Sequence, residues 1–326
     1  MEFQLKMLML AFFASVIIAI FVIPILKKLK IGQIERSDGP QSHLKKQGTP
    51  TMGGIIMLLS IIIVSIVAYL YYYKTNIRVA NRLIPLVLAA VGFGRIIGFI
   101  DDFKKLVLKN TKGLKPSHKM LGLLIISTAY VVYIVTVLKI ETITIIPIFK
   151  TAIELPIWIF IPFAIVVMLA TTNAINLTDG VDGLSTSVSA IIIATLTAIA
   201  IRFGTNEVVV YGCITCGAAL GFLLFNMHKA KVFMGDTGSL MLGGIISAMA
   251  IYLQMPLILI IIALIPVLES LSVILQVAYF KKTGNRIFKM APLHHHFELS
   301  GWKENTIVSV FSIITLILCV FGISSI

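Results

Sequence analysis

The chain has 326 residues, of which 58% are hydrophobic and 13% are charged, and its formal net charge is +13 at pH 7. A soluble protein of this length could not bury so much apolar surface, so the composition excludes a soluble globular fold. The apolar residues form runs of about 20, the length of a membrane-spanning helix, without the alternation of a membrane β-barrel. We therefore predict an all-α, polytopic integral membrane protein with a single transmembrane domain over residues 1–326.

Ten membrane-spanning helices are predicted from these runs. They cover residues 4–26, 51–73, 80–100, 119–138, 155–172, 186–202, 207–225, 237–253, 256–280 and 305–325. The first run is too long for the core of a signal peptide and lacks a small-residue cleavage site after it, so we expect it to be retained. The three cysteines, Cys213, Cys216 and Cys319, lie inside apolar runs, which favours packing over redox or metal chemistry.

The loops alternate in charge. Nineteen of the 27 lysines and arginines lie in the loops 27–50, 103–119, 173–185, 226–236 and 281–304. The positive-inside rule places these loops in the cytoplasm and both termini outside it. The positive charge therefore reflects membrane orientation, and we expect no nucleic-acid partner.

All six aspartates fall on the same predicted cytoplasmic side. They are Asp38, Asp101, Asp102, Asp179, Asp182 and Asp236. The positive-inside rule counts lysine and arginine and is nearly blind to aspartate, so it does not explain this bias. We infer that a function on this face needs carboxylates.

The first cytoplasmic loop ends in a run of glycine and threonine, Gly48 to Gly54, which contains Thr51. We expect Thr49 as N-cap and Pro50 at the first position of the second span. Lys46, beside that helix N-terminus, would form an anion site. The alternative is a solvated positive flank.

The third span ends in Asp101 and Asp102. Adjacent helical positions point about 100° apart, so one carboxylate would face a pocket while its neighbour holds a lysine or a metal-bound water. Carboxylates at a helix C-terminus oppose the helix dipole, which argues against simple capping. Lys105 and Lys119 follow as possible phosphate contacts or as solvated charges. Arg95, inside the span, fits neither pattern.

A second polar stretch runs from Asn173 to Gly183, where Asn173, Asn176, Asp179 and Asp182 are three residues apart. On a continuous helix these side chains would spread over half the circumference, and the glycines weaken a helix. We therefore expect the fifth span to end near Asn173 and the polar groups to wrap a ligand from a loop. Helix capping alone would use one or two of the four.

Two later loops carry further polar groups. Asp236 opens the eighth span, where it could simply be an N-cap, and Phe233 is either an interfacial aromatic or a platform for a base. The run Pro292 to Glu298 contains His294, His295 and His296, which point in three directions on a helix and so cannot bind one metal together. They suit phosphate, hydroxyl or proton handling. Glu269, in the ninth span, is expected to face the interior of the bundle.

Together these groups predict a cytoplasmic active site built from residues 27–50, 101–119, 173–185, 226–239 and 281–304. Its hard oxygen ligands favour Mg²⁺ or Mn²⁺. Lysines, a divalent ion and helix N-termini suit a diphosphate, and Phe233 suits a base. This pattern indicates phosphoryl transfer from a nucleotide to an acceptor in the membrane.

Five runs carry a resemblance to a known family: Gly48 to Gly54, Asp101 to Lys105, Asn173 to Gly183, Phe233 to Ser239 and Pro292 to Glu298. In these runs the chain resembles the polyprenyl-phosphate N-acetylhexosamine-1-phosphate transferase superfamily. The run Pro-Leu-His-His-His-Phe-Glu is similar to its phospho-N-acetylmuramoyl-pentapeptide transferase branch. The resemblance implies a Mg²⁺-dependent transfer of phospho-MurNAc-pentapeptide from its UDP conjugate to undecaprenyl phosphate, giving lipid I and UMP. It also implies a homodimer in the bacterial cytoplasmic membrane.

The resemblance also implies roles for individual residues. Asp236 would bind the metal, and Asp101, with Asp102 beside it, would deprotonate or orient the lipid phosphate. Phe233 would stack on uracil, and Asp182 with Lys46 would fix the uridine. The remaining candidates line the sugar–diphosphate pocket or contact substrate: Asp179 and His294 as catalytic groups, and Thr51, Lys105, Lys119, Asn173, Asn176, His295 and His296 as binding groups.

Two other functions stay open from the sequence. One is the related transfer of N-acetylglucosamine phosphate, which differs in the UDP-sugar accepted. The other is an ion-coupled transporter, which would place acidic residues near the bilayer midplane and show interrupted, repeated halves. The aspartates lie at one predicted face instead, and no repeat is visible.

Overall fold

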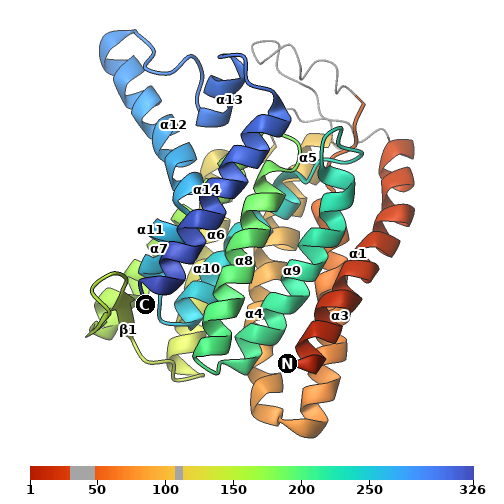
Figure 1. Ribbon diagram of the computed structural model, residues 1–326, viewed down its shortest axis with the longest axis vertical. Coiled ribbons are helices and arrows are strands. Elements are labelled where there is room, and N and C mark those ends of the chain that lie inside the picture. The colour runs from red at the N-terminus through yellow and green to blue at the C-terminus, as the bar shows by residue number, and fades with distance from the viewer. Residues whose placement is uncertain (30–47, 107–112) are drawn as a thin grey trace.

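The computed structural model describes residues 1–29, 48–106 and 113–326 as a bundle of helices (Figure 1). The α-helices are α1 (Glu2–Lys28), α3 (Gly54–Thr75), α4 (Ile77–Val91), α5 (Phe99–Leu106), α6 (Pro116–Thr136), α7 (Ile157–Thr178), α8 (Leu184–Arg202), α9 (Asn206–Asn226), α10 (Gly235–Tyr252), α11 (Leu259–Ile262), α12 (Leu264–Thr283), α13 (Leu293–Glu298) and α14 (Glu304–Ser324). A π-helix, η1 (Gly92–Gly98), joins α4 to α5, and a 3-10 helix, η2 (Pro256–Ile258), precedes α11.

Within the described residues, nine helices are long and apolar enough to cross a membrane. This confirms the prediction of a helical, multi-pass membrane protein. The eighth predicted span, 237–253, coincides with α10, which is not among the nine because its first turn is rich in polar residues and glycine.

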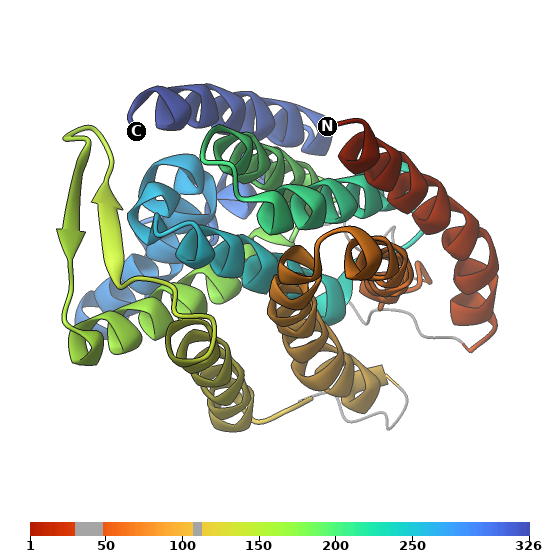
Figure 2. The ribbon, with the colours of Figure 1, turned by 90° about the horizontal axis from the view of Figure 1, so that it is seen from below.

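Helix α10 forms the core of the bundle. Its residues from Thr237 to Tyr252 are buried, and it packs against α3, α4, η1, α7 and α8. Seen along the bundle in Figure 2, α10 is surrounded by other helices. The peripheral helices α1, α12 and α14 expose large apolar side chains such as Phe21, Ile274 and Ile317, as expected for surfaces that face lipid.

The two termini lie at one end of the bundle, while α5 and α13 lie at the other (Figure 1). The termini share their end with a hairpin of β1 (Ile143–Ile146) and β2 (Thr151–Glu154). Its turn is tied to the C-terminus by the Ile148 N–H, which donates to the Ser325 carbonyl at 2.8 Å. Both termini therefore share one side, as predicted; which side faces the cytoplasm stays a prediction.

The prediction of helices alone missed this hairpin. Its strands, Ile-Thr-Ile-Ile and Thr-Ala-Ile-Glu, are rich in β-branched residues that favour strands, but they lie between two long apolar spans that mask the pattern. The Ile145 N–H donates to the Gln254 carbonyl at 3.0 Å, which fixes the hairpin on the bundle.

Several predicted helix boundaries were wrong. Helix α3 begins at Gly54 rather than at Thr49 and Pro50, and the ninth span is broken into η2, α11 and α12. The fifth span does not end near Asn173, because α7 continues to Thr178. The third span continues through η1 into α5, so Asp101 and Asp102 lie on a helix rather than at its end.

Candidate functional site

The site begins where α5 meets the N-terminus of α10. Asp102 Oδ1 accepts from the Asp236 N–H at 3.1 Å, and its Oδ2 accepts from the N–H and Oγ1 of Thr237 at 2.8 and 2.6 Å. Helix N-termini leave backbone N–H groups without an intrahelical partner. Asp102 therefore caps α10 from a neighbouring helix, and this contact sets the position of Asp236.

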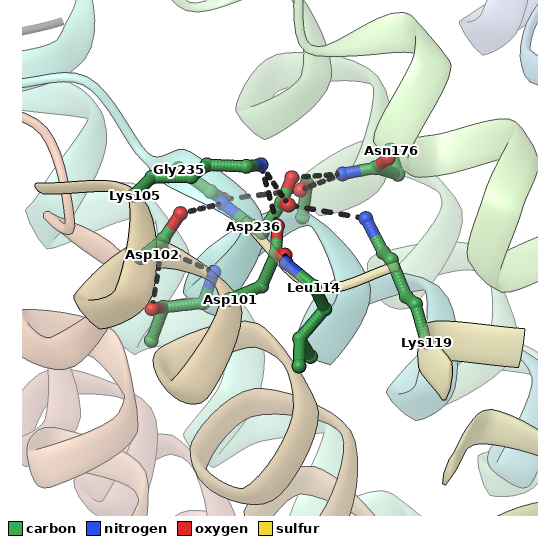
Figure 3. Close-up of polar contacts among 10 residues, drawn as sticks. Asp101, Asp102, Lys105, Leu114, Lys119, Asn176, Gly235 and Asp236 are labelled. Atoms are coloured by element: carbon green, nitrogen blue, oxygen red, sulfur yellow. Dashed lines mark hydrogen bonds and ion pairs between the residues drawn. The ribbon is translucent and has the colours of Figure 1, made fainter. Parts of the chain in front are cut away.

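Asp236 lies at the centre of a charged cluster (Figure 3). Its Oδ2 accepts from the Nζ atoms of Lys105 at 2.9 Å and Lys119 at 3.0 Å. Its Oδ1 accepts from Asn176 Nδ2 at 2.8 Å, and the same Nδ2 lies 2.8 Å from Ser239 Oγ. Three elements, α5, α6 and α7, thus send side chains to one carboxylate on α10.

Asp101 joins the cluster from the same helix as Lys105. Its Oδ2 lies 2.5 Å from Lys105 Nζ, and its Oδ1 accepts from the Leu114 N–H at 2.6 Å. Lys105 therefore bridges Asp101 and Asp236, the two carboxylates for which the family resemblance implies roles at the lipid phosphate and at the metal. Adjacent residues do point apart as predicted: Asp101 turns to the cluster and Asp102 to the start of α10.

Asp179, which follows α7, adds a fourth carboxyl group. Burial, together with the charges of Asp236, Asp102 and Asp182, raises the pKa of Asp179 to about 8. Asp179 therefore holds its proton at neutral pH in the metal-free protein. A perturbed group among other ionisable groups is typical of functional sites.

The donors of this cluster fit a hard divalent cation. Four carboxyl groups, Asp101, Asp102, Asp179 and Asp236, meet two ammonium groups, so acidic groups are in excess. Lys105 Nζ marks a point where Asp101 and Asp236 share one positive charge. Oxygen donors of this kind suit Mg²⁺, which prefers one or two carboxylates and keeps several waters.

The glycine-threonine run packs directly on the run around Asp236. The Gly53 N–H donates to the Phe233 carbonyl at 2.8 Å, and the Phe233 N–H donates to the Pro50 carbonyl at 2.8 Å. A Cβ on Gly53 would stand 2.7 Å from the Phe233 oxygen, and one on Gly54 would clash with the backbone of Gly238. The glycines are therefore needed for close backbone contact rather than for a flexible loop.

Thr51 and Phe233 lie on this seam. Thr51 is buried, and its Oγ1 lies 3.0 Å from where a Cβ on Gly235 would stand, beside Asp102. Phe233 is partly buried with its backbone paired on both sides, so its ring is held on a fixed backbone.

Asp182 lies in a separate group. Its Oδ2 accepts from the Ala230 N–H at 3.1 Å and lies 3.5 Å from His228 Nδ1, which in turn lies 3.6 Å from Glu304 Oε2. One ligand atom from each of these three residues falls within 4.8 Å of the others. This group includes an imidazole, whereas Mg²⁺ prefers oxygen, so the predicted metal position at Asp236 remains the better fit.

The three histidines do point in different directions, as predicted. His294 is buried, and its Nδ1 lies 3.1 Å from Glu269 Oε2, which confirms that Glu269 faces the interior. His295 Nδ1 lies 2.8 Å from Glu298 Oε2, and His296 Nδ1 accepts from the Lys289 N–H at 3.2 Å. Of the three, only His294 has its ring against the Asp179–Gly180 corner.

The structure brings six of the fifteen predicted site residues into one network. Asp101, Asp102, Lys105, Lys119, Asn176 and Asp236 form one hydrogen-bonded network. Asn173 lies apart, since its Nδ2 donates to the Leu169 carbonyl of its own helix at 2.7 Å. Lys46 and Asp38 lie outside the described residues.

Some contributing residues had no clear sequence signal. Asn226 links the segment before Phe233 to α8, because Thr186 Oγ1 donates to its Oδ1 at 2.8 Å and its Nδ2 donates to the Val232 carbonyl at 3.1 Å. Only its position at the end of an apolar span, next to the Asp236 run, could have pointed to it. Arg95 is exposed on η1, whereas Gly94 and Gly98 of the same helix pack against α10, so Arg95 does not join the site.

Known proteins are similar to this chain along nearly its whole length. The model of a family described as glycosyl transferase family 4 matches residues 86–254. Relatives named phospho-N-acetylmuramoyl-pentapeptide-transferase include one from Clostridium kluyveri, 48% identical over 97% of this chain and 97% of the relative. Those of Acetivibrio thermocellus and Staphylococcus carnosus are 45% and 46% identical over 96% of this chain, and they are covered over 92% and 96% of their own lengths.

The chain belongs to the phospho-N-acetylmuramoyl-pentapeptide-transferase family. This confirms the family expected from the five runs. The matched region, 86–254, includes Asp101, Asp102, Asn176, Asp179 and Asp236, so the cluster around α10 lies within the part that defines the wider family.

Proposed function

We propose that the chain transfers phospho-MurNAc-pentapeptide from UDP-MurNAc-pentapeptide to undecaprenyl phosphate, giving lipid I and UMP. The observation that supports this most directly is the Asp236 cluster, where two lysines and an excess of carboxyl groups meet at one end of a membrane bundle. Such a site suits two phosphate-bearing substrates and a cation between them. The names of the relatives point to the same reaction.

In this proposal Asp101 and Lys105 handle the lipid phosphate. Lys105 lies on the α5 segment, whose exposed neighbours Ile100 and Phe103 offer an apolar surface to the prenyl chain. The second pKa of a phosphate monoester is about 6, so most of the acceptor is already ionised at neutral pH. Asp101 therefore needs to orient the acceptor more than to deprotonate it.

The nucleotide occupies the side of the site formed by Phe233 and Asp182. Phe233 stacks on uracil, and Asp182 with Lys46 binds the uridine. Lys119, Asn176 and Thr51 lie towards the diphosphate, and His295 and His296 towards the sugar. Asp102, whose described contacts are with the start of α10, positions Asp236 rather than touching substrate.

Asp236, with Asp101 nearby, would hold Mg²⁺. When bound, the ion supplies positive charge that lowers the repulsion between the lipid phosphate and the diphosphate. Lys105 and Lys119 supply further positive charge from α5 and α6. Because both lysines contact Asp236, they would share this carboxylate with a bound ion.

The reaction proceeds by direct attack. An oxygen of the lipid phosphate forms a bond to the sugar-linked phosphorus, the bond to the UMP oxygen breaks, and UMP leaves. A separate aspartyl nucleophile is not needed, because the acceptor is already an anion, and carboxylates that hold a metal are poor nucleophiles. A trapped sugar-phosphoryl-aspartate, or ping-pong kinetics, would contradict this order of events.

The deciding experiment offers each UDP-sugar to the purified protein. UDP-MurNAc-pentapeptide with undecaprenyl phosphate and Mg²⁺ should release UMP and form lipid I, and UDP-GlcNAc should not react. EDTA should stop the reaction and Mg²⁺ restore it. Turnover of UDP-GlcNAc alone would instead assign the chain to the N-acetylglucosamine-phosphate branch.

We also place the active site on the cytoplasmic side of the bacterial membrane and propose a homodimer. Labelling of a single cysteine introduced at exposed Lys289, with an impermeant reagent applied to intact cells and to inverted vesicles, tests the sidedness. Labelling in inverted vesicles only is expected. Native mass spectrometry in detergent tests the dimer.

A further inference from the structure

A buried acid–histidine pair lies where α12 meets α13. Glu269, on the membrane-spanning helix α12, and His294, in the first turn of α13, are 0% and 1% exposed. His294 Nδ1 lies 3.1 Å from Glu269 Oε2. The backbone N–H of His294 donates to Glu269 Oε1 at 3.2 Å. A charged residue inside a membrane helix is costly, and such residues commonly serve a function.

The two contacts fix how the imidazole is oriented. Both carboxylate oxygens of Glu269 accept from His294: Oε1 accepts from the backbone N–H and Oε2 accepts from the ring. A carboxylate can only accept, so the ring nitrogen that faces it, Nδ1, carries a hydrogen. The other ring nitrogen, Nε2, is then the atom that His294 presents to its surroundings.

Nε2 points to the corner after α7. A Cβ on Gly180 would collide with Nε2, so this nitrogen lies directly against Gly180, the residue after Asp179. Among the described residues Nε2 is buried and has no hydrogen-bond partner. Burying a polar atom without a partner costs about 1–3 kcal/mol, so such an atom needs an explanation.

We propose that Glu269 is a positioning residue that holds His294 as an imidazolium whose Nε2–H donates to a phosphate oxygen of the nucleotide sugar as charge builds up there. This inference rests on the proposed function. The Glu269 carboxylate stabilises the second proton on the ring, as carboxylates do for imidazolium groups in other enzymes. A buried pair of one carboxylate and one imidazolium carries no net charge, so it is compatible with the apolar interior.

The alternative is that the pair only ties α13 to α12. The chain offers a matched control for this, because Gln276 on the same helix makes such a tie. Its Oε1 accepts from the N–H groups of Ile287 and Phe288, both at 3.0 Å. A variant of Gln276 loosens the same segment without touching His294.

The test is a double-mutant cycle on the full-length protein in detergent, with initial rates of lipid I formation. Glu269→Gln keeps the volume but has one acceptor oxygen and no charge, so it cannot satisfy both His294 donors. We expect Glu269→Gln and His294→Ala each to lower kcat about 100-fold while KM for UDP-MurNAc-pentapeptide changes less than about threefold. Glu269→Gln in the His294→Ala background should cause no further loss.

Gly180→Ala offers an independent variant, because its methyl group would displace the ring at Nε2 without removing either partner. It should lower kcat to a similar degree in the wild-type background and have no further effect with His294→Ala. Gln276→Ala should lower the melting temperature while kcat stays within about twofold of the wild type.

Distinct outcomes overturn distinct claims. Losses from Glu269→Gln and His294→Ala that multiply in the double variant, or an unchanged kcat in Glu269→Gln, would overturn the positioning role while leaving the proposed function intact. A wild-type protein that forms no lipid I would overturn the proposed function and, with it, this inference.

Discussion

Helix α10 carries a buried polar network at each of its ends, and the two differ in charge balance. At its C-terminal end Glu207 Oε1 accepts from Arg82 Nη1 at 3.2 Å and from the Tyr252 hydroxyl at 2.7 Å. One acid meets one base, and the hydroxyl adds no charge. At its N-terminal end Asp236 meets two lysines, but Asp101, Asp102 and Asp179 crowd around it.

The Glu207 network holds the bundle together, whereas the Asp236 network belongs to the candidate active site. The Glu207 network is balanced and joins α4, α9 and α10, which is what a structural tie requires. The Asp236 network has more acidic than basic groups, which fits the Mg²⁺ proposed there. Both ends of α10 thus carry buried polar groups, but only at the Asp236 end do acidic groups outnumber basic ones, and this distinguishes the candidate site.

The largest expected effect is at Asp236. Asp236→Asn removes the carboxylate on which Lys105, Lys119 and the proposed Mg²⁺ converge, so lipid I synthesis should fall by about 1,000-fold or more. Lys105 keeps Asp101 as a partner, but Lys119 loses its contact with a carboxylate, so the free energy of unfolding should also fall, by about 1–3 kcal/mol. Rates of UMP release and thermal melting in detergent measure the two quantities. Near-normal activity would remove this metal position.

A large effect on both activity and stability is expected at the seam of the two glycine-rich runs. Gly54→Ala places a methyl group against the backbone of Gly238, which has to move. We expect a loss of about 1–3 kcal/mol in stability and a loss of activity, because Phe233 and Asp236 shift together. Gly284→Asn is the control, since no atom lies within 4 Å of a Cβ there and asparagine tolerates its positive φ of 72°.

At the balanced end, the expected effect is on stability alone. Glu207→Ala leaves Arg82 half-buried without its partner and should cost about 1–3 kcal/mol. The kcat of the folded fraction should stay unchanged. Replacing Arg82 and Glu207 together by leucine should recover part of the loss, because no unpaired charge remains. A fall in kcat in the folded fraction of Glu207→Ala would break the contrast between the two ends.

The smallest expected effect is the pH dependence that Asp179 contributes. The folded-state pKa of Asp179 is raised to about 8, above its ordinary value of 3.8, so the folded protein holds a proton that the unfolded chain releases. In EDTA the stability of the wild type should therefore decline as the pH rises from about 4 to about 8. Asp179→Asn should flatten this slope, as measured by melting temperatures across the range. An unchanged slope would mean that Asp179 is ionised in the folded state.

Much of the site could be predicted because the chain is so apolar. Asp101, Asp102 and Asp236 stand out at the ends of apolar runs, and the positive-inside rule puts them on one side without any knowledge of the fold. The sequence placed Lys105 and Lys119 on the same side as possible phosphate contacts, but their meeting at Asp236 is visible only in the fold. In a soluble protein the same residues would be lost among many surface charges.

Other features depend on contacts between distant parts of the chain. The sequence from Asn173 to Gly183 has weak helix propensity, yet α7 continues to Thr178, because Asn176 is held by Asp236 and Ser239. The spacing of three residues predicted a loop, but in the structure these residues are helical. Asn176 faces α10, whereas the Asn173 side chain bonds to the backbone of its own helix. The contact between Glu269 and His294 likewise could not be predicted, because the two residues are 25 positions apart in the chain.

The π-helix η1 governs the angular register of the residues that follow it. A π-turn accommodates one residue more than an α-turn, so the segment Gly92–Gly98 rotates α5 relative to a continuous α-helix from α4. Deleting one residue there would shift α5 by one helical position, about 100°, so that Asp102 took the place of Asp101 and Phe103 took the place of Asp102. The start of α10 would then face Phe103 and lose the carboxylate that accepts from its N–H groups. The number of residues in η1, about two turns upstream, therefore determines which aspartate faces the charged cluster and which faces α10.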